Sequence, residues 1–134
     1  MIVKNWIATA TLVGIVYAAV GILFAIPTSN VRVWRLASWF VSAVAYGTYI
    51  LYERFRLGST PVATASHVAV AAAIGGFGLA VGANIHSMVV SGPNQHHTLL
   101  RVSLVIWPIA TAVPAFLVAL AISWALARVQ RRNA

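Results

Sequence analysis

Four long apolar blocks fill most of this 134-residue chain, and only one acidic residue, Glu53, stands among its residues. Hydrophobic residues make up 61% of the sequence and charged residues 7%, which leaves too few polar side chains to cover a water-soluble domain. A helix needs roughly 20 predominantly apolar residues to cross a bilayer, and each block is close to that length or longer. The alternating pattern of a membrane β-barrel is absent from the sequence. The sequence therefore predicts an all-α integral membrane protein.

The predicted architecture is a four-helix transmembrane bundle with antiparallel up-down helices, forming a single membrane domain over residues 1–134. Short polar connections separate the apolar blocks, which cover about residues 6–27, 36–52, 65–90 and 99–127. With four spans both termini share one side of the membrane. Six basic residues then flank the spans on that side, and three flank them on the other. Because basic flanks resist translocation, we expect cytoplasmic termini in a bacterial inner membrane, with dual topology as the alternative.

Composition narrows the classes of function. The net charge of +8 does not indicate nucleic-acid binding, because the basic residues flank the spans instead of forming one face. The absence of cysteine excludes thiolate catalysis, and a single carboxylate side chain excludes paired-carboxylate catalysis within one chain. No catalytic residue and no cofactor are predicted, although a bound lipid or quinone is compatible with such a sequence. The expected partners are the bilayer and other membrane subunits or further copies of the chain.

The second block carries a polar stripe along one side of its predicted helix. Its members follow one another at spacings of three or four residues: Arg35, Ser38, Ser42, Tyr46, Tyr49, Glu53 and Arg56. At about 100° per residue, these side chains fall on one face of a helix. Polar groups in hydrocarbon need partners, so the stripe is expected to face the bundle interior or another chain. It represents either interhelical hydrogen bonding or the wall of a hydrated path or ligand cleft.

Glu53 is expected at the cytoplasmic end of this stripe, next to Arg54 and Arg56. An ionised carboxylate paired with arginine at the membrane interface is the favoured interpretation, and a proton relay is the alternative.

On the opposite side of the membrane, three imidazoles could bind zinc or copper. They belong to His86, His96 and His97. Since no carboxylate lies nearby, polar side chains at the interface are the simpler interpretation of these histidines.

Small residues recur at helical spacing in three of the blocks and predict close helix packing. Such residues let helix backbones approach one another in lipid, where the hydrophobic effect offers no drive for association. The candidate packing residues are Gly14, Ala69, Ala73, Gly76, Gly78, Ala80, Gly82 and Ala119. The third block carries small residues on two sides, which predicts contacts either within the bundle or with another subunit.

Three functions fit these observations. The favoured one is a non-catalytic accessory or structural subunit of a membrane assembly, either a hetero-oligomer or a homo-oligomer, because small-residue faces are abundant and reactive groups are few. The first alternative is a small oligomeric channel or transporter whose polar path follows the second helix. The second alternative is a membrane enzyme or cofactor-binding protein that uses Tyr49, Glu53 and Arg54 or the three histidines.

Overall fold

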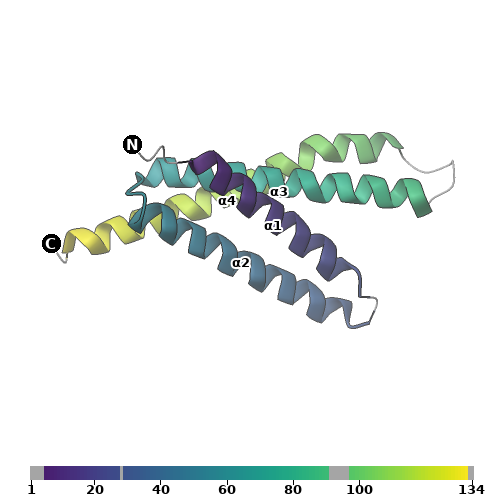
Figure 1. The fold of residues 1–134 in the computed structure, drawn as a ribbon, viewed down its shortest axis with the longest axis horizontal. Helices are drawn as coiled ribbons and strands as arrows, with labels where there is room; N and C mark the ends of the chain where they lie inside the picture. Colours follow the sequence, from purple (N-terminus) through teal and green to yellow (C-terminus); the bar gives the residue numbers. More distant parts are fainter. Residues whose placement is uncertain (1–4, 28, 91–96, 133–134) are drawn as a thin grey trace.

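The fold is all-α. The computed structural model describes residues 5–27, 29–90 and 97–132. Four helices account for nearly all of this part: α1 (Trp6–Ala25), α2 (Val31–Phe55), α3 (Pro61–Val90) and α4 (His97–Arg132). Successive helices run in opposite directions, so α1 begins and α4 ends at the same end of the molecule (Figure 1). We call this the terminal end, and the opposite end, where α2 begins and α3 ends, the distal end. The predicted all-α class with four helices is confirmed.

Helix α2 extends beyond its predicted range of 36–52 in both directions. It begins directly after Asn30, whose backbone φ of 53° lies in the left-handed region. It ends at Phe55, and Gly58, with a φ of 61°, helps to turn the chain toward α3. The first residue of α3 is Pro61, which suits this position because it has no N–H to leave unbonded. The predicted range was too short because it followed hydropathy, whereas the helix continues into polar residues.

Three of the four helices are long and apolar enough to cross a membrane. They are Trp6–Ala25, Pro61–Val90 and Thr98–Arg132. The prediction of four such helices is therefore supported for three. Helix α2 differs because it carries the polar stripe and has charged residues near both of its ends. Its polar side chains would need shelter from lipid if α2 also crosses a bilayer.

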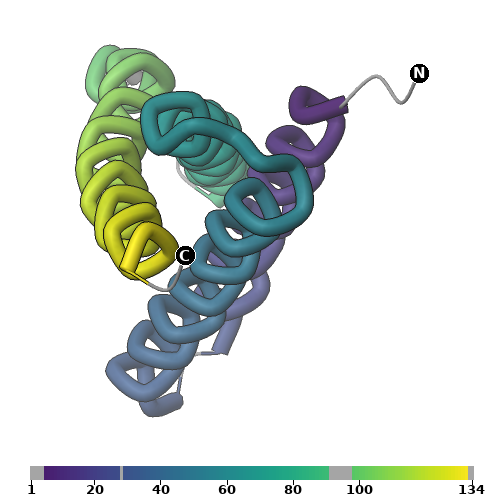
Figure 2. The backbone as a smooth tube through the Cα atoms, turned by 90° about the vertical axis from the view of Figure 1, so that its left-hand side faces the viewer, coloured from purple at the N-terminus to yellow at the C-terminus, as the bar shows by residue number. Residues whose placement is uncertain are grey.

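The four helices lie side by side in the order α2, α1, α3, α4. Helix α3 packs against both α1 and α4, α2 packs mainly against α1, and α1 and α4 do not approach each other. Helices α2 and α4 make few contacts. Helix α2 lies close to α3 and α4 at the terminal end and diverges from them toward the distal end, while α1 stays packed on α3 as far as Ile22 (Figures 1 and 2). We call the side on which α2 and α4 diverge the open side.

Glycines bring α1 and α3 into close contact. A Cβ atom added at Gly14 would lie 2.7 Å from the carbonyl oxygen of Ala71 and 2.8 Å from the side chain of Ile74. The arrangement is reciprocal, because Gly75 on α3 lies under the ring of Tyr17 on α1. Further close approaches occur at Gly21, Gly78 and Gly82. Glycine at these positions lets the two backbones pack without a lipid-filled gap.

Polar contacts add to the packing between α3 and α4. Gly76 leaves room for Thr111, whose Oγ1 donates toward the carbonyl oxygen of Ala72 over 3.0 Å. Nearer the distal end, Asn84 Nδ2 donates to the carbonyl oxygen of Leu100 on α4 over 2.9 Å. Helices α3 and α4 are therefore held together over much of their length, including near the distal end.

The predicted packing residues lie at or near these interfaces. The buried ones are Gly14, Gly76, Ala80 and Ala119. The partly buried ones are Ala69, Ala73, Gly78 and Gly82. Both small-residue sides of α3 are occupied within the chain, since Gly76 faces α4 and Gly78 and Gly82 face α1.

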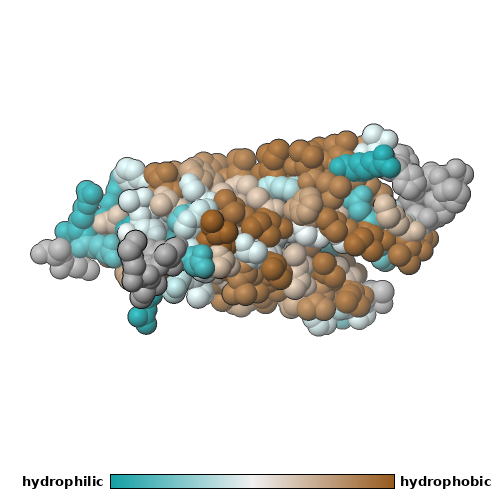
Figure 3. Space-filling view, turned by 45° about the horizontal axis from the view of Figure 1, so that its top comes forward, coloured by the Kyte–Doolittle hydropathy of each residue, from teal (hydrophilic) through white to brown (hydrophobic). Residues whose placement is uncertain are grey.

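Large apolar side chains cover most of the outer surface. Many side chains of α1 and α4 are exposed, including Leu12, Leu23, Ile109 and Leu117. Figure 3 shows apolar residues spread over the middle of the molecule and hydrophilic residues gathered toward the terminal end. This distribution matches a molecule whose middle is surrounded by hydrocarbon and whose end reaches the headgroups.

Candidate functional site

Glu53 lies at the centre of a polar cluster at the terminal end. Its side chain has no exposed surface, although it is only two residues from the end of α2. Its Oε2 atom accepts a hydrogen bond from Ser59 Oγ over 2.7 Å. The same oxygen lies 3.0 Å from His67 Nδ1 on α3. The only carboxylate side chain of the protein is therefore sequestered between α2, the connection after it and α3.

His67 is held in place from a second direction. The indole ring of Trp6 on α1 stacks on the imidazole ring, with centroids 4.2 Å apart and an angle of 10° between the planes. The His67 side chain keeps 17% of its surface exposed. The imidazole thus lies between a buried carboxylate and the surface. Such a pair can hold a proton as carboxylate and imidazolium or as carboxylic acid and imidazole, and the contact is retained in both forms.

Arg54 binds oxygens other than those of Glu53. Its Nη1 donates to the carbonyl oxygen of Ser59 over 2.6 Å, and its Nη2 donates to Gln130 Oε1 on α4 over 3.2 Å. In the part of the chain that the structure describes, the only acid–base pair within 4.0 Å is the one between Glu53 and His67. The predicted pairing of Glu53 with arginine is therefore wrong. Arg54 instead clamps the connection after α2 and the end of α4 to the cluster.

Several buried polar atoms around this cluster have no hydrogen-bond partner. The oxygens are Tyr46 Oη, Tyr49 Oη, Glu53 Oε1, Thr64 Oγ1 and Ser123 Oγ. The Tyr49 hydroxyl lies near the Glu53 carboxylate, but the two groups do not meet hydrogen-bond geometry. Buried polar atoms in proteins are nearly always bonded, and each exception calls for an explanation. Here the exceptions follow the polar stripe and the helix faces at the terminal end.

The polar stripe becomes more buried along α2 toward Glu53. Arg35 and Arg56 at its two ends are exposed, Ser38, Ser42 and Tyr46 are partly buried, and Tyr49 and Glu53 are buried. Tyr49 and Tyr46 pack against a core that includes residues of α3 and α4. Positions on the same face but nearer the distal end therefore point to the open side. The structure brings the buried end of the stripe into the four-helix core and leaves the other end uncovered.

The serine hydroxyls of the stripe differ from other hydroxyls of the protein. Thr48 Oγ1 and Ser66 Oγ each donate to the carbonyl oxygen four residues earlier, over 2.8 Å and 2.9 Å. Such bonds let a hydroxyl face lipid with its proton satisfied. Neither Ser38 nor Ser42 makes a hydrogen bond to any described residue. The prediction that stripe hydroxyls bond neighbouring helices is not realised at these two positions.

The predicted metal site falls largely outside the described residues. His96 and the side chain of His97 lie there, while His86 lies on α3 and is exposed. Within the described residues, no group of three metal-ligating side chains occurs. The contacts that define the cluster around Glu53 are made by His67 and Ser59. Neither residue was among the predicted site residues.

Comparison of the chain with protein-family models, with curated proteins and with solved structures finds no match. A proposal about function therefore depends on the cluster around Glu53, the polar stripe and the open side.

Proposed function

We propose that this chain is an integral membrane protein in which all four helices cross the bilayer and both termini are cytoplasmic. Three helices meet the requirements of length and hydropathy, and α2 lies antiparallel to α1 and covers a similar distance. The excess of basic residues at the terminal end supports the orientation, since six of the nine lie there in sequence. A bacterial inner membrane is the proposed location.

The proposed function is that of a non-catalytic subunit of a membrane assembly. The observation that carries this proposal is the unbonded part of the polar stripe, where Ser42 has no hydrogen-bond partner within the described chain. In hydrocarbon, a hydroxyl gains by finding an acceptor on an adjacent helix. Helices α2 and α4 make few contacts with each other, so a helix of another chain on the open side would supply such an acceptor. That helix belongs either to another subunit or to a second copy of the chain.

Native mass spectrometry of the tagged protein, released from the membranes of its own host in a mild detergent, tests this proposal. We expect recovery with a stoichiometric partner or as a homo-oligomer. Ser42→Leu should reduce this recovery because it fills the open side, whereas Thr48→Leu, which lies off the stripe, should not. Recovery of only the monomer, with both variants unchanged, would contradict the proposed subunit function.

A second candidate function is a polar path for protons along α2. The specific observation in its favour is that the stripe leads to a buried carboxylate in contact with an imidazole. Hydroxyls and protonatable pairs of this kind occur along proton routes in membrane proteins. Reconstituted vesicles containing a pH-sensitive dye test it. Proton flux that is lost in Glu53→Gln would support a path, and flux equal to that of protein-free vesicles would contradict it.

A further inference from the structure

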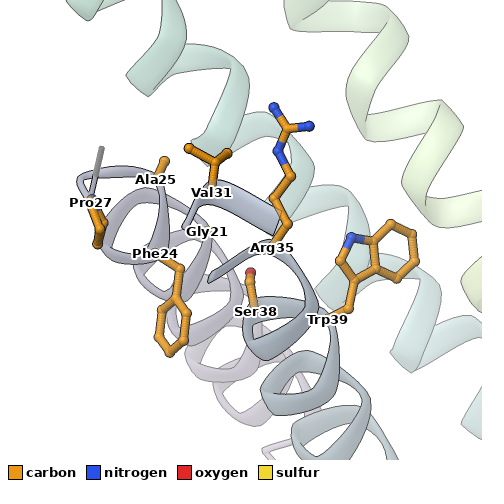
Figure 4. Close-up of a pocket in the computed structure, with 8 residues that line it drawn as sticks. All are labelled: Gly21, Phe24, Ala25, Pro27, Val31, Arg35, Ser38 and Trp39. Atoms are coloured by element: carbon orange, nitrogen blue, oxygen red, sulfur yellow. The ribbon is translucent and has the colours of Figure 1, made fainter. Parts of the chain in front are cut away.

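A second polar site lies at the distal end, between the end of α1 and the beginning of α2. It is a cavity of about 390 Å³. Arg35, Ser38 and Trp39 line it from α2, together with Val31 and with Ala25 at the end of α1. In Figure 4 the side chains of Val31, Arg35 and Ser38 point to the same side, toward α3 and α4, and Trp39 flanks them. The cavity therefore combines a guanidinium and a hydroxyl with apolar walls.

No acidic side chain of the protein lies near enough to neutralise the guanidinium of Arg35. The only acidic side chain, Glu53, lies about 27 Å away along the axis of α2, at 1.5 Å per residue. It is already bound to Ser59 and His67. Among the described residues, no acceptor forms a hydrogen bond or ion pair with Arg35. At the edge of a membrane a guanidinium favours an anionic group, and the described residues supply none to Arg35.

We propose that this cavity binds the phosphate group of an anionic phospholipid. Arg35 would bind two phosphate oxygens with its planar guanidinium, because the spacing of its N–H groups matches them. The Ser38 hydroxyl, one turn later on the same face, supplies a further donor. The apolar walls formed by Val31, Ala25 and Trp39 receive the first part of an acyl chain. This inference rests on the membrane placement proposed above, but not on the proposed partner subunit.

The depth of Arg35 favours a lipid phosphate over a carboxylate of a partner helix. Arg35 lies about one turn from the start of α2, roughly 6 Å along the axis, which corresponds to the headgroup level if α2 crosses the bilayer. Trp34 lies at the same level and Trp39 about one turn farther along α2, and tryptophan is enriched at membrane interfaces. A carboxylate on a partner helix would have to be at this same depth, whereas phosphates are present there in every bilayer.

The test compares Arg35→Gln with Arg32→Gln. The two substitutions remove the same charge near the start of the same helix, but Arg32 does not line the cavity. Each protein is reconstituted in bilayers of phosphatidylglycerol and phosphatidylcholine, extracted gently, and analysed by native mass spectrometry for retained lipid. We expect the wild type to retain phosphatidylglycerol, Arg35→Gln to lose it by about tenfold or more, and Arg32→Gln to resemble the wild type. Arg35→Lys keeps the charge without the paired donors and should give an intermediate loss.

Other outcomes would overturn the proposal. Equal loss in Arg35→Gln and Arg32→Gln would show general attraction by surface charge. Displacement of the lipid by inorganic phosphate at low concentration would assign the site to a soluble phosphate, and retention of a partner protein in place of lipid would assign Arg35 to a carboxylate. Alkaline extraction of the membranes is run in parallel. Release of the wild type into solution would refute the membrane placement itself, and this failure is distinct from loss of lipid binding in a membrane-embedded protein.

Discussion

Arg54 and Arg35 lie on the same helix, and they have opposite surroundings. Near the terminal end, Arg54 donates to Ser59 and Gln130 and thereby joins α2 to α4. At the distal end, Arg35 is exposed and makes no bond to a described residue. An arginine side chain thus joins helices where four helices converge, and it remains available for a ligand where they diverge. For these two arginines, the packing of the helices around the side chain, and not the residue type, determines whether the guanidinium has a hydrogen-bond partner.

The divergence has a cause in the interfaces. Glycines hold α1 against α3, and Asn84 holds α3 against α4 near the distal end. Helix α2 follows α1, and nothing equivalent connects it to α4 at that end. The terminal end is closed by contacts to Glu53 and Arg54. Four predictions test this difference between the two ends.

The largest effect is expected from Gly14→Leu. Its side chain would collide with the carbonyl oxygen of Ala71, a backbone atom that cannot move aside without separating α1 from α3. We expect a loss of about 3 kcal/mol or failure to fold. Gly47→Leu on α2 is the control, because a Cβ there has no neighbour within 4 Å. Thermal unfolding in detergent, followed by tryptophan fluorescence, measures both variants, and equal tolerance would contradict the packing of α1 on α3.

The next effect concerns the pair of Glu53 and His67. Glu53→Ala removes the acceptor of two buried contacts, and we expect a loss of about 2–3 kcal/mol in the free energy of unfolding. A double-mutant cycle with His67→Ala should give a coupling energy above about 1 kcal/mol. His86→Ala, which removes an exposed histidine on the same helix, should be neutral. Additive losses for Glu53 and His67 would show that their contact contributes nothing.

A smaller effect separates the two arginines. Arg54→Gln should lower the free energy of unfolding by about 1–2 kcal/mol, because it removes donors to Ser59 and Gln130. Arg35→Gln should change it by less than about 0.5 kcal/mol in detergent without anionic lipid. Addition of phosphatidylglycerol should then stabilise the wild type and Arg54→Gln but not Arg35→Gln. Equal destabilisation by the two substitutions in lipid-free detergent would remove the contrast between the two ends.

The sequence predicted the helical class and the polar stripe but not the contacts of Glu53. Hydropathy identifies apolar blocks, so it found α1, α3 and α4 readily and placed the ends of α2 too far inside the helix. Glu53 was assigned to arginine because Arg54 and Arg56 are its neighbours in sequence. Arg54 is adjacent to Glu53 and therefore points in a different direction, whereas Arg56 lies on the same face but is exposed. The carboxylate instead faces α3. His67 and Glu53 are equally far from Thr60 along the chain, and in an antiparallel helix pair such positions lie at similar depth. The equal spacing from Thr60 could therefore have predicted the contact between Glu53 and His67.

The divergence of α2 from α3 and α4 could not be predicted from the sequence. The positions of small residues indicate which faces pack closely, but the angle between helices depends on how side chains such as Tyr17 and Leu79 fit over glycines on the facing helix. The sequence therefore predicted the polar stripe of α2 but not which helices would cover it.

The smallest effect on the isolated chain is expected from Tyr46→Phe. The Tyr46 hydroxyl is buried without a partner, so its removal loses no hydrogen bond and ends the cost of burying it. The ring contact with Tyr17, with centroids 5.6 Å apart, is retained. We expect a change within about 0.5 kcal/mol, or slight stabilisation, in detergent. In native membranes the same result is expected, because the hydroxyl is buried within the chain and lies out of reach of a partner helix. A monomer destabilised by more than about 1 kcal/mol would show that the hydroxyl is bonded within the chain.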